Sequence, residues 1–141
     1  LFQVNKLVFI PWNRSDFTGH ADGMVRFIDD NTVLINDYSK ESVSYQRNFR
    51  MALHNAGLEW IELPYNPYQN FSADSACGVY INFLQMQQAI IVPVFNSHFD
   101  DFALKVISEA FNGHVIRTVN SEELAEQGGI LNCITWNIAV S

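Results

Sequence analysis

Residues 24–36, Met24-Val-Arg-Phe-Ile-Asp-Asp-Asn-Thr-Val-Leu-Ile-Asn36, predict a tight β-hairpin, because two apolar runs flank a short polar turn. A helix is expected next, since Ser42 and Ser44 offer start signals and Gly57 is well placed as a C-terminal cap. Trp60-Ile-Glu-Leu63 then predicts a strand that ends at Pro64. The rough apolar face of the helix consists of Val43, Phe49, Met51, Leu53 and Ala56.

The same order of elements returns further along the chain. Gly78-Val-Tyr-Ile-Asn-Phe83, a polar turn at 85–88 and the strongly apolar Ala89-Ile-Ile-Val-Pro-Val-Phe95 predict a second hairpin. Asp100 and Asp101 favour the start of a second helix, which Asn112-Gly113 closes. The strand Val115-Ile-Arg-Thr-Val119 completes this copy. The two apolar faces of the second helix are Phe102, Val106 and Ala110, and Leu104, Ile107 and Phe111.

Strand, turn, strand, helix, strand therefore occurs twice, at approximately 24–66 and 78–120, with a period of about 55 residues. Repeats of this size point to blades or arrays in an α/β fold. Between the copies, residues 65–76 are expected to form an ordered surface loop.

The ends of the chain carry further expected elements. Residues 4–10 alternate and predict a strand, and residues 121–127 predict a short helix capped by Ser121. Gly128-Gly129 leads into a last strand at 131–140, which carries Cys133. The chain begins with neither an initiator Met nor a signal-like leader, so we expect it to be a piece of a longer protein.

The bulk composition narrows the class of protein. With 141 residues, 48% of them hydrophobic, the chain can bury a core as one domain. Its apolar runs fall far short of the roughly 20 residues that cross a bilayer, so no membrane partner is expected. A net charge of −7 with eight Lys and Arg residues disfavours nucleic acid and is compatible with a cationic substrate. Two cysteines are too few for a disulfide framework, which favours a reducing compartment such as the cytoplasm.

Two segments carry the candidate chemistry. In His20-Ala21-Asp22 the two polar side chains would project from one face of an extended segment, flanked by glycines that leave room for a ligand. This pair could transfer protons and bind a cation; the alternative is a surface loop in which His20 is merely solvated. Cys133 could be a nucleophile, because polar Asn132 and Thr135 are unusual in a core strand; the alternative is a buried structural thiol.

The remaining candidates favour structural roles. Cys77, next to Gly78, is expected to be structural, and His54, His98 and His114 are expected at helix ends or on the surface. No spacing matches a zinc site, a dinucleotide loop or a nucleophile elbow, so neither a metal nor a cofactor is expected.

The ordered motifs together resemble the family of agmatine deiminases and bacterial, Porphyromonas-type peptidylarginine deiminases, which belongs to the guanidino-modifying enzymes. The resemblance covers nearly the whole chain, and the order and spacing of its motifs make it specific. Its anchors are Leu7-Val-Phe-Ile-Pro11, Thr18-Gly-His-Ala-Asp22 with Arg26-Phe27, Tyr80-Ile-Asn-Phe83, Ile90-Ile-Val-Pro93, Asp100-Asp101 and Gly128-Gly-Ile-Leu-Asn-Cys-Ile-Thr135.

This resemblance implies a pentein fold, a five-bladed α/β propeller of which the chain would supply about two blades, without the N-terminal ones. It implies that Cys133 attacks a guanidinium carbon and expels ammonia, and that water hydrolyses the thiouronium adduct to a ureido product. His20 would be the general acid and base, and Asp22 would hold the guanidinium nitrogens. The expected substrate is agmatine, arginine or peptidyl arginine. The family's further carboxylates lie upstream of this chain, so the fragment alone is expected to be inactive.

Two departures keep alternatives open. The family commonly has a His before the catalytic Cys and Gln residues after Cys-Ile-Thr, where this chain has Asn132 and Trp136. These differences favour a noncatalytic propeller fragment that serves as a binding or interaction module. An amidinotransferase-like enzyme, in which an amine attacks the adduct, is the alternative among enzymes. Exposed blade edges are also expected to pair copies of the chain into a homo-oligomer.

Overall fold

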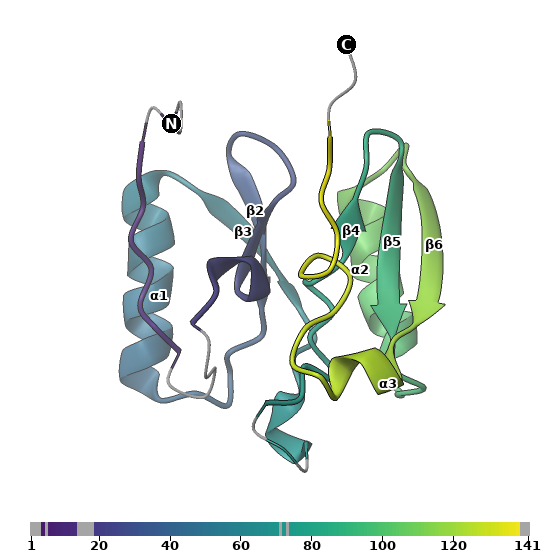
Figure 1. Ribbon diagram of the computed structural model, residues 1–141. Coiled ribbons are helices and arrows are strands. Elements are labelled where there is room, and N and C mark those ends of the chain that lie inside the picture. Colours follow the sequence, from purple (N-terminus) through teal and green to yellow (C-terminus); the bar gives the residue numbers. More distant parts are fainter. Residues whose placement is uncertain (1–3, 5, 14–18, 71, 73, 139–141) are drawn as a thin grey trace.

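The computed structural model describes residues 4, 6–13, 19–70, 72 and 74–138 (Figure 1). The first repeat contains β1 (Val25–Phe27), β2 (Thr32–Asn36), α1 (Val43–Ala56) and β3 (Glu59–Leu63). β1 pairs antiparallel with β2, and β3 pairs parallel with β2, so α1 is the crossover between the two parallel strands. The predicted hairpin, helix and strand are therefore confirmed.

Local signals set the bounds of α1. The Ser42 Oγ accepts a hydrogen bond from the backbone N–H of Tyr45 at 3.2 Å, which satisfies one of the unpaired donors of the first turn. Gly57 ends the helix with φ +76°, a left-handed conformation that glycine adopts without strain.

The second repeat contains β4 (Leu84–Gln85), β5 (Ala89–Val94), α2 (Asp100–Ala110) and β6 (Val115–Asn120). Its pairing copies that of the first repeat: β4 lies antiparallel to β5, and β6 lies parallel to β5. Asp100, the first residue of α2, accepts hydrogen bonds from the backbone N–H groups of Phe95 and Ser97 in the segment before the helix. Helical turns η1 (Ala21–Gly23), η2 (Pro67–Gln69) and α3 (Glu122–Ala125) lie outside the two units.

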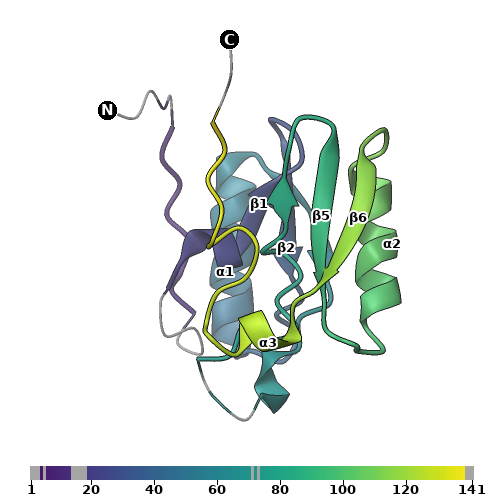
Figure 2. The same cartoon turned by 45° about the vertical axis from the view of Figure 1, so that its right-hand side comes forward.

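The two units lie side by side, with α1 on one flank of the molecule and α2 packed behind β5 and β6 (Figures 1 and 2). Among the described residues, the strands form two separate three-stranded sheets and no closed sheet. Residues 6–13 run along α1, where the Lys6 ammonium donates to the carbonyl of Ala56 at 2.8 Å.

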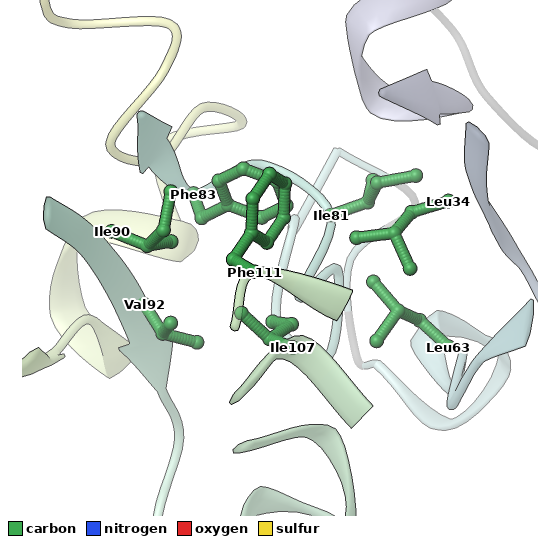
Figure 3. Close-up of a cluster of buried hydrophobic side chains, with 8 residues drawn as sticks. All are labelled: Leu34, Leu63, Ile81, Phe83, Ile90, Val92, Ile107 and Phe111. Carbon is green, nitrogen blue, oxygen red and sulfur yellow. The ribbon is translucent and has the colours of Figure 1, made fainter. Parts of the chain in front are cut away.

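A shared hydrophobic core joins the units (Figure 3). Leu34 of β2 and Leu63 of β3 face Ile107 of α2 and Ile81, and all four side chains are fully buried. Burying one such side chain contributes about 1.5–3 kcal/mol relative to leaving it exposed. The other members of the cluster are Phe83, Ile90, Val92 and Phe111.

Three predicted strands are wrong. Val4 and residues 6–13 contain no strand, and Leu7 and Phe9 are 71% and 82% exposed. Residues 78–83 form turns and irregular backbone with one isolated bridge, from Val79 to Tyr65, so the second hairpin starts only at β4. Residues 131–134 form a turn and 135–138 no regular element, so Cys133 lies on a turn. Alternation reports which side chains can be buried, but a strand also needs a neighbour to complete its ladder.

The helices also differ in detail from the prediction. In α1, Phe49 and Leu53 are buried, whereas Val43 is 81% exposed. In α2, Ala103 and Ile107 face the core and Phe102 is 55% exposed. The last helix covers only Glu122–Ala125, and the Ser121 hydroxyl donates to the Val119 carbonyl instead of capping it. No helix within the described ranges has the length and apolar character that crossing a membrane requires.

Candidate active site

Asp22 lies on the helical turn η1, directly before β1. Backbone N–H groups of Gly23 and Met24 donate to the carbonyls of His20 and Ala21 at 3.1 and 3.0 Å, which closes the turn. The buried side chain of Asn36 on β2 donates to the Gly23 carbonyl at 2.7 Å. Asp22 is therefore attached to the first sheet by a buried amide.

Cys133 lies on the turn that follows α3. The backbone N–H of Ile134 donates to the Ile130 carbonyl at 3.2 Å, and the Thr135 hydroxyl donates to the Leu131 carbonyl at 2.7 Å. Ile130 and Leu131 are buried against Tyr80 and Phe95 of the second unit, whereas the Cys133 side chain is exposed. The thiol thus stands on a turn whose base is fixed in the core.

Gly129 leaves room for this thiol. A Cβ at residue 129 would lie 3.0 Å from the Cβ of Cys133 and 3.6 Å from its Sγ, a contact tighter than side chains normally tolerate. Gly129, which belongs to the Gly-Gly pair noted in the sequence, therefore allows the backbone at residue 129 to lie close to Cys133.

Cys133 and Asp22 meet across the two units. The Sγ of Cys133 lies 3.8 Å from the Oδ2 of Asp22, although 111 positions separate the residues. The same carboxylate oxygen accepts a hydrogen bond from the Asn132 side-chain amide at 2.7 Å. A carboxylate beside an exposed sulfur is an arrangement suited to a cation, which would pair with the carboxylate within reach of the nucleophile.

Asn82 connects the members of this cluster. Its Nδ2 donates to the Cys133 Sγ at 3.1 Å and to the Asp22 Oδ2 at 3.5 Å. Its Oδ1 accepts from the backbone N–H groups of Asn132 and Cys133 at 3.1 and 3.4 Å. One buried amide therefore contacts the carboxylate, the sulfur and the backbone that carries the sulfur.

Arg26 adds a partly buried positive charge. Its guanidinium lies over the ring of Phe83, 4.7 Å from the ring centroid, in a cation–π contact. Burial lowers the pKa of Arg26 from its ordinary value, while the charges of Asp22 and Cys133 oppose that shift. A side chain of β1 thus contributes to the electrostatics of the cluster.

His20 is not joined to Cys133 in the same way. Its backbone is extended, η1 begins directly after it, and its side chain makes no capping hydrogen bond to that turn. The expectation of one extended segment with His20 and Asp22 on a common face is therefore wrong. The imidazole is exposed, and within the described residues no hydrogen bond connects it to Asp22 or Cys133.

The second cysteine, Cys77, has different surroundings from Cys133. Cys77 is partly buried and unpaired with another cysteine, and burial, followed by the charge of Glu126, raises the pKa of its thiol.

A hollow of about 430 Å³ lies elsewhere, beside α1 and β3, and includes Arg47 and Trp60 in its lining. Asp22, Asn82, Asn132 and Cys133 are not among the residues that line this hollow.

Sequence reasoning missed Asn82 and the role of Asn132 toward Asp22. Asn82 stands among Ile81 and Phe83, both fully buried, and a polar residue in such an apolar run needs a partner. That signal could have identified Asn82 as a residue with buried partners. It could not have predicted that these partners are Asp22, Asn132 and Cys133.

Comparison with known proteins agrees with the resemblance seen in the sequence. The profile of the family described as Porphyromonas-type peptidyl-arginine deiminase matches residues 1–138. A relative from Mycoplasma capricolum, named "Putative agmatine deiminase", is 39% identical over 56 residues, which cover 40% of this chain and 15% of that protein.

The fold is also similar to solved structures. The agmatine deiminase of C. jejuni matches with a TM-score of 0.68 and 28% identity, over 89% of this chain and 38% of that one. An agmatine deiminase of Enterococcus faecalis has a TM-score of 0.66 at 22% identity, over 82% of this chain and 39% of that one, a likeness of fold alone. The chain thus spans well under half the length of the structures it matches.

Proposed function

The chain belongs to the Porphyromonas-type peptidyl-arginine deiminase family, and from this premise we propose that it supplies the nucleophile of a guanidine deiminase. The reaction converts agmatine, arginine or peptidyl arginine into a ureido product and ammonia. Cys133 is the nucleophile, Asp22 binds the guanidinium and His20 transfers protons. The observation that carries this proposal is the approach of the Cys133 Sγ to the Asp22 carboxylate at 3.8 Å.

The steps balance as a hydrolysis. The Cys133 thiol gives its proton to His20, and its sulfur forms a bond to the guanidinium carbon. His20 returns the proton to one amino group, which leaves as ammonia and so produces the covalent thiouronium adduct. A water molecule then adds to the same carbon and gives a proton to His20. The carbon–sulfur bond breaks, the ureido product leaves, and the thiol recovers its proton. The one proton that remains from the guanidinium cation leaves with ammonia as ammonium.

The electrostatics of the site support a cationic substrate. A thiolate and a carboxylate 3.8 Å apart repel each other, and a guanidinium bound between them would stabilise both charges. Asp22 offers two oxygens to the planar fork of a guanidinium, a geometry that allows paired charge-assisted hydrogen bonds. The net charge of −7 also favours approach of a cation.

His20 is proposed for proton transfer because it precedes Asp22 by two residues and is exposed. Rotation of an exposed imidazole towards a bound substrate requires no repacking of the core. Histidine is also the side chain whose unperturbed pKa lies near neutral pH, which suits both acid and base roles.

The proposal extends to the architecture of the intact protein. Two units of equal strand order are what neighbouring blades of a five-bladed propeller would look like. Because the chain spans only 38% of the C. jejuni structure, we propose that it is the C-terminal part of one pentein domain and is inactive alone. Further substrate contacts would come from the missing part.

A noncatalytic binding module remains the second candidate. Asn132 replaces the histidine expected before the cysteine and uses its amide to hold Asp22 at 2.7 Å. Trp136, where a glutamine is expected, is 88% exposed and available for a partner. A site that binds a guanidine without hydrolysing it would retain Asp22 and lose turnover.

The test is a colour assay for ureido groups with agmatine, arginine and an internal-arginine peptide. It compares a protein that contains the remaining part of the domain with the 141-residue chain alone. We expect turnover only in the longer protein, loss of turnover in Cys133→Ser and normal turnover in Cys77→Ser. Asp22→Asn should raise KM by about 10- to 100-fold, because it removes a charge-assisted contact.

Equal turnover in Cys133→Ser and the unaltered protein would overturn the nucleophile assignment. Binding of agmatine without any ureido product would support the binding module. Transfer of the amidino group to an added amine, in place of hydrolysis, would identify a transferase.

A further inference from the structure

Two arginines and a histidine gather on one side of α1, in a chain whose net charge is −7. Arg47, Arg50 and His54 follow one another at spacings of three and four residues, so they lie along the same side of the helix. They line the hollow of about 430 Å³ beside α1 and β3, and no Asp or Glu is among the described residues of its lining. A local excess of positive charge in an acidic chain favours an anion at this hollow.

The two guanidinium groups have donors to offer. Arg47 is exposed, and within the described ranges no hydrogen bond or ion pair engages its guanidinium. Arg50 donates through Nη2 to the Oε1 of Glu62 at 3.1 Å and has further N–H donors on the same fork. Planar guanidinium groups suit a carboxylate or phosphate group, whose oxygens they can hold in pairs.

Apolar side chains complete the lining of the hollow. Trp60 on β3 packs against the core of the first unit, whereas Val43 and Met51 are 81% and 47% exposed. An indole held by the core offers a rigid surface to a ring or an alkyl chain. The volume of about 430 Å³ also lies in the range of roughly 300–1,000 Å³ that small-molecule sites have. The lining therefore suits an anion with an apolar body better than a bare inorganic ion.

The repeat indicates that the hollow stays open in a longer protein. Leu53 of α1 corresponds to Ile107 of α2, since each is the last buried residue of its helix. Six positions earlier, Arg47 therefore takes the place of Asp101. Asp101 is exposed although the first unit packs against α2 through the shared core. A further unit that packed on α1 in the same way would leave Arg47 exposed.

We propose that the hollow beside α1 and β3 is a binding site for a small organic anion. The guanidinium groups of Arg47 and Arg50 hold its carboxylate or phosphate group, and Trp60 with Met51 contacts its apolar part. The site is separate from the cluster of Asp22 and Cys133, and it does not depend on any guanidine chemistry.

The test is an NMR titration of the 141-residue chain with phenyl phosphate and 3-phenylpropionate, which join one ring to either anionic group. We expect dissociation constants of about 1–10 mM, as for other ligands of this size. The indole N–H signal of Trp60, identified by its absence in Trp60→Phe, should move as either anion is added. The uncharged 3-phenylpropanol should bind at least about 10-fold more weakly, because it lacks the group that the guanidinium groups hold.

Arg47→Gln should weaken the binding of both anions by about 10-fold, because it removes charge-assisted hydrogen bonds. Arg117→Gln is the matched control: it makes the same change, with the same loss of charge, in an exposed arginine of β6. Its affinity should stay near that of the unaltered chain. Equal weakening in both variants would show a general effect of net charge and would overturn the site.

The titration is then repeated with a protein that contains the remaining part of the domain. Movement of the Trp60 signal in both proteins supports the site, whereas movement in the 141-residue chain alone would show that the missing part covers the hollow and would overturn the proposal. An unmoved Trp60 signal with both anions would overturn it as well, and binding of an acidic peptide in their place would identify a contact surface for another protein. None of these results depends on turnover, so this site and the deiminase proposal can fail separately.

Discussion

Asp29 shapes the turn between β1 and β2 with one carboxylate oxygen. Its Oδ1 accepts hydrogen bonds from the backbone N–H groups of Asn31 and Thr32, both at 2.8 Å. The bond from Asn31 is the main reason that the pKa of Asp29 is lowered from its ordinary value of 3.8. A residue that the sequence presents as a simple turn former thus has a defined chemical role.

The lowered pKa predicts a pH dependence of stability. A carboxyl with a depressed folded-state pKa stabilises the fold above its unfolded-state pKa, and that stabilisation is lost as pH falls through the folded-state pKa. We therefore expect part of the unfolding free energy to disappear as the pH falls from about 5 to below 3.8. Asp29→Asn should lose less on acidification, measured by urea unfolding at pH 7, 5 and 3. Equal losses in both proteins would contradict the prediction.

Among the elements, α1 shows how single capping residues determine where a helix begins and ends. Ser42 caps the first turn, Gly57 ends the last one, and two buried side chains, Phe49 and Leu53, attach the helix to the first sheet. The exposed Val43 shows that the rough apolar face inferred from the sequence was too wide. Helix ends depend on local hydrogen bonds, whereas the buried face depends on what lies opposite.

Ser42→Ala should destabilise the chain by about 1 kcal/mol, because the N–H of Tyr45 loses its side-chain acceptor. Ser44→Ala is the matched control, since Ser44 is exposed inside the helix and alanine has the higher helix propensity. Thermal and urea unfolding of both variants measure the effect. A loss in Ser44→Ala equal to that in Ser42→Ala would show that the cap is not the cause.

At the scale of the whole molecule, the site exists only because the two units pack together. Asp22 is attached to the first unit, whereas Asn82 and Cys133 are attached to the second. Leu34 and Leu63 enter the core of the second unit and so fix the separation of these groups. The geometry of the site and the stability of the fold therefore depend on the same core.

Leu34→Ala should cost about 2–5 kcal/mol, because it removes a fully buried side chain from the shared core. Leu7→Ala, in which the removed side chain is 71% exposed, should change stability by no more than about 0.5 kcal/mol. Urea unfolding followed by both circular dichroism and tryptophan fluorescence should show one coincident transition for Leu34→Ala. Two separate transitions would mean that the units unfold independently.

The repeated strand, turn, strand, helix, strand order, the two long helices and the parallel strands after them were predictable from residues near in sequence. Cys133 and Asp22 were predictable as candidates through the family motifs, but their contact was not. The predicted strands at 78–83 and 131–140 failed for the described residues, because alternation does not supply a strand with a pairing partner. Their apolar side chains instead fill the core around turns.

By itself the sequence determined the two long helices, the strands that flank them, the repeat and the family, since turn formers, caps and hydrophobic periods act over a few residues. Only the tertiary structure decided that a carboxylate, an amide and a thiol from positions 22, 82 and 133 form one cluster. The physical reason is that such a cluster depends on the packing of two units across a common core, which no short-range pattern encodes.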